Sequence, residues 1–305
     1  MKSKRLFLFA AYDKDGIIDD TLVYYLDVLS KLGDIILTMD CDVKDVSKLK
    51  TIKNLLHFET TRHEEYDFGS YKRNYMWAFD KKILDNYDWV YFVNDSVYGP
   101  LFDMEPCLKE LESRDADLIG MVDFFDKYTP KHIQSWFLGV SKKIATSKML
   151  YDFMQNIRKR KNKLEIIYKY EIGLSRMILQ NDFKMFTLFS QNGYESHPLY
   201  DNPKLILENF IPFVKKQGLK NIGGNVCLLP YTSDYLNDII FAHAERVGIN
   251  YPKQNIGIQL KDRIYRLTFL SIPLCTIFQE DFSGSEVFRV YIFDKIKIMK
   301  IIRKK

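Results

Sequence analysis

The sequence predicts an α/β protein built on a mostly parallel sheet flanked by helices, with a mainly helical C-terminal extension. In the first half of the chain, short apolar runs alternate with stretches of helical periodicity, which is typical of successive β–α–β units. The run DWVYFV at 88–93 is almost continuously apolar, as expected of a strand that is buried on both faces. Beyond about residue 200 this alternation gives way to helical stretches. We therefore expect two domains, at residues 1–215 and 216–305.

The individual elements are expected from local periodicity and from residues suited to their ends. The first strand is expected at 6–11, and Asp19 with its two polar neighbours offers caps for a helix at 20–31. Gly33 is placed to end this helix, because glycine readily adopts the left-handed conformation that often follows a last turn. Further strands are expected at 34–39, 55–58, 88–93, 117–122, 133–140 and 185–189. Further helices are expected at 71–82, 105–113, 145–163, 164–181, 205–217 and 234–247.

The net charge of the chain is concentrated at its C-terminus. The 305 residues carry a formal charge of +5, but seven Lys or Arg and one Asp lie within 289–305, so residues 1–288 carry about −1. A nucleic-acid-binding protein is expected to carry excess positive charge on the folded surface that meets phosphate. The composition therefore argues against a nucleic-acid partner.

Cysteine usage and hydropathy indicate the compartment. The four cysteines lie far apart without a CxxC pair, so the sequence predicts neither a zinc site nor a disulfide framework, and a reducing cytoplasm is expected. The apolar run near the N-terminus is about six residues long and stops at Tyr12, which favours a strand over a signal peptide. No run reaches the roughly 18 apolar residues that a membrane span needs.

The C-terminal segment 287–305 has two interpretations. Its sequence, VFRVYIFDKIKIMKIIRKK, combines large apolar residues with seven basic ones, as an interfacial anchor would. Such a segment could lie along the anionic inner face of the plasma membrane, where each Lys or Arg contributes about 1 kcal/mol. The alternative is a terminal strand or helix with a solvated basic tail.

The strongest local signal is the motif FVNDSVYGPL at 92–101. Asp95 follows a predicted buried strand, and in open α/β sheets ligands collect beyond the carboxyl ends of strands. With Asn94 and Ser96 as further oxygen ligands, Asp95 could hold Mg²⁺ or Mn²⁺ between two phosphates of a ligand. The alternative is an ordinary turn, because Asn, Asp, Ser and Gly-Pro all favour turns.

Other residues near strand ends and helix starts are candidates to bind the same ligand. Tyr12 and Asp40 end the first two expected strands. In the motif DFGSYK, Asp67 could hydrogen-bond a ribose or a base, Gly69 could let the backbone approach the ligand, and Lys72 lies one turn further on. The alternative for this motif is a capped helix start.

Two further residues could act in chemistry at this site. Glu171, in the helical stretch YEIGLS, could be the base that deprotonates an acceptor hydroxyl, although an exposed helical glutamate is equally compatible with the spacing. His197 could complete the shell of a metal bound at Asp95, although a histidine before proline is common in loops.

Together these motifs resemble the rhamnan-synthesis F-type family of bacterial glycosyltransferases. The matching segments, in the family's order across roughly residues 8–215, are AYDKDGIIDDTLVYYLDVL, EYDFGSYK, FVNDSVYGPL, HIQSWFLGVSK, YEIGLS and YDNPKL. The pairing of NDSVYGPL with HIQSWF downstream is the most specific of them. Within HIQSWF, we expect His132, Gln134 and Trp136 to bind the acceptor.

The resemblance implies a GT-A-like, Rossmann-type fold and transfer from a nucleotide-diphosphate sugar, typically L-rhamnose on thymidine diphosphate, to cell-wall rhamnan or O-antigen glycans. It places Asp95 where such enzymes hold the metal and the diphosphate, although Asn94-Asp95-Ser96 is not a full Asp-x-Asp motif. It places Asp67 and Gly69 where the nucleoside is held, and Glu171 is our candidate base by its order along the chain. A polysaccharide or lipid-linked glycan is the expected acceptor.

Two other functions remain open at this stage. A sugar-phosphate nucleotidyltransferase uses a similar sheet, but it would normally carry a glycine-rich basic loop after the first strand, and YDKDG is a poor version of one. A non-catalytic glycan-binding subunit of a polysaccharide assembly complex could keep the fold without turnover.

Overall fold

The computed structural model describes residues 3–191, 198–221, 232–249, 263–269, 272–282, 285–292 and 296–304. The chain divides into two compact units, Met1–Ile222 and Gly223–Lys305. In the described residues, no helix is long and apolar enough to cross a lipid bilayer.

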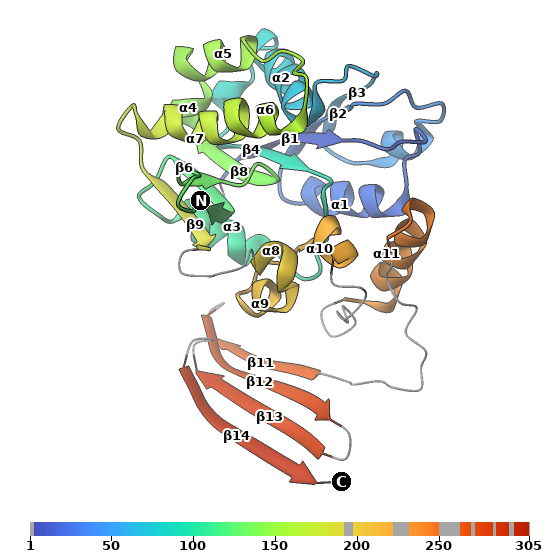
Figure 1. Ribbon diagram of the computed structural model, residues 1–305, viewed down its shortest axis with the longest axis vertical. Helices are drawn as coiled ribbons and strands as arrows, with labels where there is room; N and C mark the ends of the chain where they lie inside the picture. Colours follow the sequence, from blue (N-terminus) through green and yellow to red (C-terminus); the bar gives the residue numbers. More distant parts are fainter. Residues whose placement is uncertain are drawn as a thin grey trace. The chain divides into compact units, whose positions relative to one another are not determined.

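An eight-stranded sheet forms the centre of the first unit (Figure 1). Its strand order is β3-β2-β1-β4-β8-β6-β7, and β9 pairs with β6. The strands β3, β2, β1 and β4 are parallel, β8 runs antiparallel between β4 and β6, and β9 is again parallel to β6. The mostly parallel sheet predicted from the sequence is therefore confirmed. The strands are β1 Arg5–Ala11, β2 Asp34–Met39, β3 Leu55–Thr60, β4 Trp89–Asn94, β6 Leu118–Phe124, β7 His132–Ile133, β8 Phe137–Ser141 and β9 Met185–Phe189.

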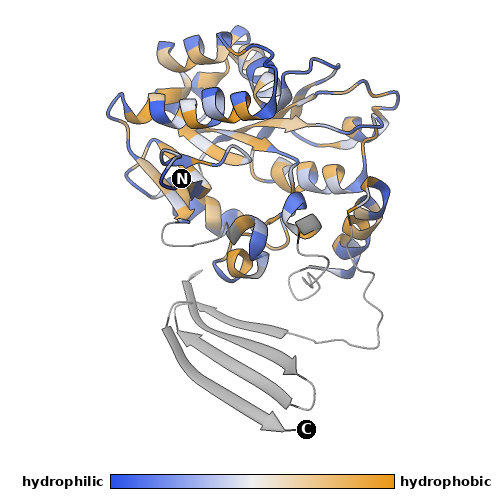
Figure 2. Ribbon diagram, viewed as in Figure 1, coloured by the Kyte–Doolittle hydropathy of each residue, from blue (hydrophilic) through white to orange (hydrophobic). Residues whose placement is uncertain are grey.

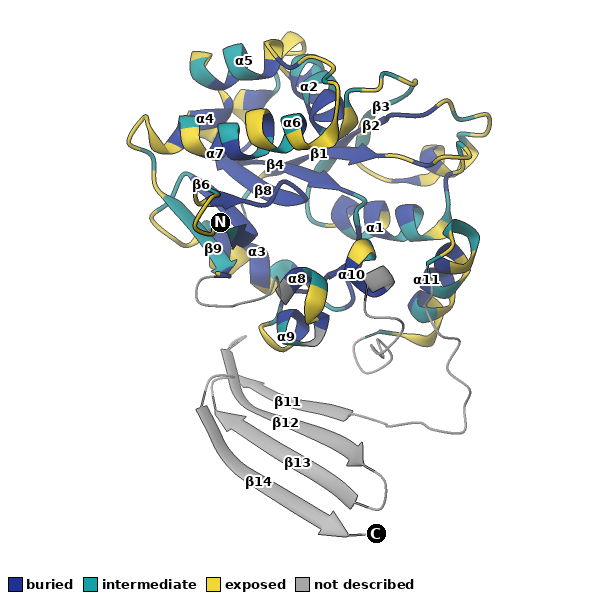
Figure 3. Ribbon diagram, viewed as in Figure 1, coloured by how far each residue is buried: buried dark blue, intermediate teal, exposed yellow. Residues whose placement is uncertain are grey.

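Helices cover both faces of this sheet. The helices α1 (Asp20–Ser30) and α3 (Glu105–Glu112) pack on one face, together with Phe7 and Phe9 of β1. On the other face, Leu6 and Leu8 of the same strand pack with α2 (Tyr66–Asp80), α4 (Lys142–Ala145), α5 (Lys148–Gln155) and α7 (Ile172–Leu179). The alternation along β1 follows from the two-residue period of a strand. The central strands are accordingly apolar and buried while the outward sides of the helices are exposed (Figures 2 and 3).

The two long helices expected over 145–181 are broken into shorter pieces. Ser147 caps α5 by accepting a hydrogen bond from the amide of Leu150, and this helix ends at Gln155 rather than near residue 163. The next segment begins with α6 (Lys163–Ile166), continues as a π-helical turn at Ile167–Glu171 and ends with α7. Turns of this kind are rare in proteins and often occur at functional sites.

A short antiparallel ribbon corrects the helix expected at 205–217. Only α9 (Pro203–Glu208) is helical at the start of that range, and β10 (Val214–Lys215) then pairs with β5 (Val97–Tyr98). Pro212 interrupts helical hydrogen bonding before Val214, which explains the change. The other short elements of this unit are α8 Pro198–Asp201, α10 Lys216–Asn221 and two 3₁₀ turns at Ser47–Thr51 and Leu84–Asn86.

The second unit is helical only in part. Its helix α11 (Asp234–Val247) has the predicted bounds, with Ser233 as the N-cap and Gly248 in the left-handed conformation after the last turn. The expectation of a mainly helical extension is wrong beyond it, because β11 to β14 form a four-stranded antiparallel sheet in sequence order. Runs such as RIYRLTF and VFRVYI are rich in β-branched and aromatic residues, which favour strands. These strands are β11 Arg263–Phe269, β12 Ile272–Phe282, β13 Ser285–Ile292 and β14 Ile296–Lys304.

A buried ion-pair network fastens β1 to α3. Arg5 donates to both carboxylate oxygens of Glu112, at 2.6 and 2.9 Å, and to Glu105 at 2.9 Å. The hydroxyl of Tyr91 on β4 donates to the same Glu112 carboxylate at 2.7 Å. Arg5 is only 2% exposed, so the network is shielded from water.

We predict that Arg5→Met lowers the free energy of unfolding by about 3–5 kcal/mol, because it leaves the Glu112 carboxylate buried without its cation. Urea denaturation measures this. The matched control is Lys31→Met, whose exposed pair with Asp27 contributes less than about 1 kcal/mol. Equal effects of the two substitutions would contradict the prediction.

Candidate functional site

Polar side chains from four segments meet at the carboxyl end of β4. Asn94 is the last residue of β4, and Asp95 and Ser96 follow it in the turn that leads to β5. Asp67 comes from the first turn of α2, Glu171 from the π-helical turn and Lys215 from β10. We call these six residues, Asp67, Asn94, Asp95, Ser96, Glu171 and Lys215, the β4 cluster.

A chain of hydrogen bonds runs through four members of the β4 cluster. The side-chain amide of Asn94 donates to Asp67 Oδ2 at 2.9 Å, and Asn94 is buried at 1% exposure. The hydroxyl of Ser96 donates to Asn94 Oδ1, and the backbone amide of Ser96 donates to the same oxygen at 3.1 Å. Lys215 Nζ in turn donates to Ser96 Oγ at 2.6 Å. The chain therefore links α2 to β10 across the end of β4.

Asp95 lies beside this chain and carries a carboxylate that is costly to keep charged. Its Oδ2 accepts a hydrogen bond from the backbone amide of Tyr12 at 3.3 Å, and its own amide donates to Ala10 O at 3.2 Å. Burial raises the pKa of Asp95, and the positive charge of Lys216 only partly offsets this. A bound cation would therefore stabilise the ionised form of this carboxylate.

The remaining charges of the β4 cluster are coupled to Asp95. Burial, and next the Asp95 carboxylate, raise the pKa of Asp67 to about 6. Burial lowers the pKa of Lys215 to about 8, while the nearby carboxylates, Glu171 foremost, oppose that shift. Glu171 is held in place by the backbone amide of Ser135, which donates to its Oε1 at 2.9 Å. Acidic and basic groups thus share one partly buried region.

Of the three residues expected at the acceptor, Trp136 lies against the β4 cluster and Gln134 contacts Trp136. The carbonyl of Trp136 accepts a hydrogen bond from the amide of Asn94 at 3.1 Å, and Lys215 Nζ lies 5.7 Å from the centroid of the Trp136 ring. Gln134 Oε1 accepts from Trp136 Nε1 at 3.2 Å. His132 is placed differently: its Nδ1 lies 2.9 Å from Pro130 O, and its ring packs edge-on against Phe124.

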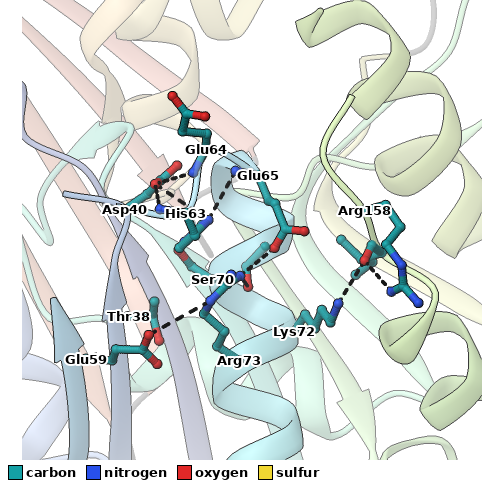
Figure 4. Close-up of polar contacts among 12 residues, drawn as sticks. Thr38, Asp40, Glu59, His63, Glu64, Glu65, Ser70, Lys72, Arg73 and Arg158 are labelled. Carbon is teal, nitrogen blue, oxygen red and sulfur yellow. Dashed lines mark hydrogen bonds and ion pairs between the residues drawn. The ribbon is translucent and has the colours of Figure 1, made fainter. Parts of the chain in front are cut away.

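Asp40 belongs to a separate polar network at the start of α2 (Figure 4). Its Oδ1 accepts hydrogen bonds from the amides of His63 and Glu64, both at 2.8 Å. His63 Nε2 lies 2.9 Å from Ser70 Oγ on α2. Asp40 therefore fixes the turn between β3 and α2, which in turn orients the helix that carries Asp67.

Close packing at this same turn explains why residue 69 is a glycine. A Cβ atom on Gly69 would lie 2.2 Å from Glu65 Cβ and 2.9 Å from the ring of His63. Any side chain would therefore displace the residues that Asp40 holds.

The ring of Tyr12, which is 49% exposed, lies under the guanidinium of Arg62, which is 5.2 Å from the ring centroid.

Lys72 points elsewhere, and His197 lies outside the described residues. Lys72 Nζ donates to Ile157 O at 2.9 Å, on the side of α2 that faces the segment of Arg158 (Figure 4). It lies away from Asp40 and His63 in that view. Of the residues in DFGSYK, Asp67 is the one that the structure brings into the β4 cluster.

Lys215 was not identified from the sequence. Its range was expected to be helical, whereas the register of β10 places Lys215 opposite Val97, one residue from Ser96. The available signal was the sequence IPFVKK, in which a proline precedes a short apolar stretch and a lysine. That pattern suits a short strand better than a helix interior.

The residues present fit a divalent metal ion in one particular way. Asn94 Oδ1 and Ser96 Oγ are already engaged in the hydrogen-bond chain, so the Asp95 carboxylate is the ligand that the motif offers. Mg²⁺ and similar ions are commonly held by one or two carboxylates together with substrate phosphates and water. Asp95 suits that mode, whereas a cage made by protein groups alone would need more free oxygens.

A groove of about 710 Å³ lies on another part of the first unit. It is formed by α5, the π-helical turn and α7, and its lining includes Arg160, Tyr168 and Arg176. None of the six residues of the β4 cluster lines it.

Comparisons with known proteins identify one family. A family model described as rhamnan synthesis protein F matches residues 35–267. No curated protein matches the chain.

Several solved structures are similar to the chain at low identity. A cytidylyltransferase from Leptospira borgpetersenii has a TM-score of 0.38 and 11% identity, over 85% of this chain and 100% of that one. Core-mannan synthase A from Aspergillus fumigatus, in its Mn/GDP form, has a TM-score of 0.34 and 11% identity, over 58% and 69%. The glycosyltransferase GlyE from Streptococcus pneumoniae has a TM-score of 0.37 and 11% identity, over 84% and 66%.

The buried ring of His63 makes stability depend on pH. Burial, and next the positive charge of Arg73, lower the pKa of His63 to about 4, against the opposing effect of Asp40 and Glu65. The unfolded chain therefore binds more protons than the folded one between about pH 6.5 and pH 4, and this part of the stability is lost as the pH falls through that range.

We predict that His63→Gln is less stable than the wild type at pH 7 and that the difference narrows as the pH falls towards 4. Denaturation across this range measures the difference, and an NMR titration of the His63 ring gives its pKa directly. A ring that titrates near pH 6.5 would contradict the account.

Proposed function

Because the chain belongs to the rhamnan synthesis protein F family, we propose that it is a glycosyltransferase that moves a sugar from a nucleoside-diphosphate donor to a bacterial surface polysaccharide. The observation that carries this proposal is the β4 cluster, in which carboxylates and a buried ammonium group meet at the carboxyl end of a central strand. Open α/β sheets bind their ligands at this edge. The family description makes L-rhamnose our first candidate for the donor sugar.

In this proposal Asp95 is the residue that meets the donor diphosphate through Mg²⁺ or Mn²⁺. Its carboxylate lies in the turn after β4 and is raised in pKa by burial, so it gains from a nearby cation. A divalent ion held there would neutralise charge on the departing diphosphate. Asp67, which accepts a hydrogen bond from Asn94, is assigned to bind the nucleoside of the donor. The half-exposed ring of Tyr12 offers a surface on which the base could stack.

Glu171 is assigned as the general base. The Ser135 amide fixes its carboxylate, Gln134 and Trp136 flank Ser135 in the sequence, and we place the acceptor on this side of Glu171. Glu171 takes the proton of the acceptor hydroxyl while that oxygen forms a bond to the anomeric carbon of the sugar. The bond from this carbon to the diphosphate oxygen breaks, and its electron pair leaves with the nucleoside diphosphate. The configuration of the anomeric carbon is inverted.

Asp40 and Gly69 enter this proposal through the position of α2. Both hold the turn before the helix that carries Asp67, so we assign them an indirect effect on the donor. The contacts of Lys72 and His132 give them no part in the β4 cluster, and we assign neither of them a role in transfer.

We further propose that the second unit brings the enzyme to the inner face of the plasma membrane, where lipid-linked acceptors are found. The basic, apolar segment that motivated this idea forms much of β13 and β14. Strand β14, with the sequence IKIMKIIRK, carries four of its basic residues. An anionic bilayer surface attracts each such residue by about 1 kcal/mol.

We predict that Glu171→Gln lowers kcat by about 10²–10⁴-fold, because the acceptor hydroxyl loses its base. Asp95→Asn, tested in the same assay, should lower turnover and also weaken its dependence on Mn²⁺. Release of nucleoside diphosphate from thymidine-diphosphate rhamnose, in the presence of a glycan acceptor, is the measurement. Asp80→Asn, an exposed carboxylate at the end of α2, is the control. Turnover within a few-fold of the wild type would remove the role of the residue concerned.

For the membrane contact, we test a variant in which glutamine replaces four basic residues of β14, namely Lys297, Lys300, Arg303 and Lys304. We predict that this variant co-sediments with phosphatidylglycerol vesicles at least about tenfold less than the wild type. The difference in vesicle binding between this variant and the wild type should disappear at high salt, where the electrostatic attraction is screened. A control variant carries glutamine at four lysines of the first unit, Lys31, Lys44, Lys48 and Lys50. Equal binding of the two variants would rule out the contact through β14.

A further inference from the structure

Lys215 is a buried ammonium group whose position is fixed by the fold. Strand β10 pairs with β5 so that Lys215 lies opposite Val97, and the amide of the next residue, Lys216, donates to Ser96 O at 3.1 Å. The backbone is therefore tied to the turn after β4 on both sides of the Lys215 side chain. The residue is only 9% exposed.

The ammonium of Lys215 has more hydrogen-bond donors than the described residues use. Its Nζ donates to Ser96 Oγ at 2.6 Å and lies 5.7 Å from the centroid of the Trp136 ring. An ammonium group has three N–H donors. Within the part of the chain that the structure describes, the Ser96 hydroxyl is the one acceptor found for them. A buried cation with spare donors is unfavourable unless further acceptors, such as water or the oxygens of a ligand, use them.

The hydrogen-bond chain also limits what a metal ion can do at this site. Asn94 Oδ1 accepts two hydrogen bonds from Ser96, so it cannot bind a metal unless this chain is broken. Ser96 Oγ accepts from Lys215 and keeps one lone pair, next to a positive charge that disfavours a metal ion. Counted from Asp95, the second carboxylate of an Asp-x-Asp motif would stand at position 93 or 97, and both are valines, whereas Ser96 is bound to an ammonium group. The ammonium group of Lys215 therefore lies against the residue that follows Asp95.

Other lysines near the β4 cluster do not make a side-chain hydrogen bond to the motif after β4 in the described residues. Lys216 Nζ lies over the ring of Tyr98, 5.3 Å from its centroid, and Lys163 is an exposed residue at the start of α6. Among the lysines that the structure describes, Lys215 alone combines burial with a hydrogen bond to the motif after β4.

We propose that Lys215 binds the diphosphate of the nucleotide-sugar donor directly and supplies positive charge that remains in the site when no divalent ion is bound. The inference rests on the proposed function and names a residue that the family resemblance did not supply. The spare N–H donors of Lys215 point to phosphate oxygens as their acceptors, since charge-assisted hydrogen bonds to phosphate are strong. Nucleoside-diphosphate binding therefore persists in part without Mg²⁺ or Mn²⁺.

Titration calorimetry with thymidine, uridine and guanosine diphosphates, each with EDTA and with Mn²⁺, tests the proposal. We expect at least one of them to bind the wild-type protein in EDTA. Lys215→Met should weaken that binding about 10- to 100-fold, the value of a hydrogen bond to a charged group. Lys215→Arg, which keeps the charge, should restore part of the affinity. Binding of the corresponding nucleoside should be unchanged in Lys215→Met, because the nucleoside lacks the phosphates.

The controls separate a binding role from a structural one. Lys50→Met removes an exposed lysine of the first unit and should bind as the wild type does. A thermal unfolding curve shows whether Lys215→Met is folded. If Lys215→Met is unfolded, Lys215→Arg takes its place, and its affinities for the diphosphate and for the nucleoside are each compared with those of the wild type. A binding role predicts a change in the diphosphate affinity alone, because a purely structural role would change both affinities together.

Each outcome bears on a different claim. Binding that requires Mn²⁺ absolutely, or equal diphosphate binding by wild type and Lys215→Met in EDTA, overturns the role of Lys215. The proposed transferase function survives that result if Asp95→Asn still loses turnover. Failure of all three diphosphates to bind, with or without Mn²⁺, would instead count against the proposed function itself.

Discussion

The balance of charge at the carboxyl end of β4 is the constraint on which the rest of the site depends. Asp67, Asp95 and Glu171 share this region with one buried ammonium group, that of Lys215. Buried charges are tolerated only when they are paired and hydrogen-bonded. Burial raises the pKa of Asp67 and lowers that of Lys215, so both charged groups carry a cost of desolvation. Such a site gains stability from a ligand that brings both negative phosphate and positive metal charge.

The fold meets this constraint by bringing together segments that are distant in sequence. Parallel pairing of β1 with β4 places the amide of Tyr12 beside Asp95, and the Arg5 network holds β1 and β4 against α3. The Asp40 network sets the start of α2 and hence the position of Asp67. The β5–β10 ribbon supplies Lys215 from more than a hundred residues further along the chain. The same contacts therefore stabilise the fold and position the residues of the β4 cluster.

Sequence reasoning predicted the elements whose signals are local. Strands β1, β2, β4 and β9 and helices α1 and α11 were expected close to their actual bounds, because apolar periodicity and capping residues such as Asp19 mark them. Position after a buried strand was also enough to single out Asn94, Asp95 and Ser96. The resemblance in motifs correctly gave the family.

What the sequence could not supply is pairing between distant residues. Lys215 reaches the site only through the register of a two-residue strand, and its range was misassigned as helix. The hydrogen bonds that Asn94 and Ser96 make with each other and with Lys215 are equally invisible in the motif. His132 and Trp136 were grouped because they lie in one motif, yet their side chains make different contacts. The C-terminal sheet was not predicted, although a terminal strand was one alternative for 287–305, because its strands pair with one another and their short apolar runs do not reveal that pairing.

The most direct test of the central claim is a crystal structure of the protein with thymidine diphosphate and Mn²⁺. The account predicts that the diphosphate lies at the carboxyl end of β4, with the ion on the Asp95 carboxylate and a phosphate oxygen within hydrogen-bond distance of Lys215 Nζ. A nucleotide bound instead in the groove between α5 and α7, with the β4 cluster unchanged, would contradict it.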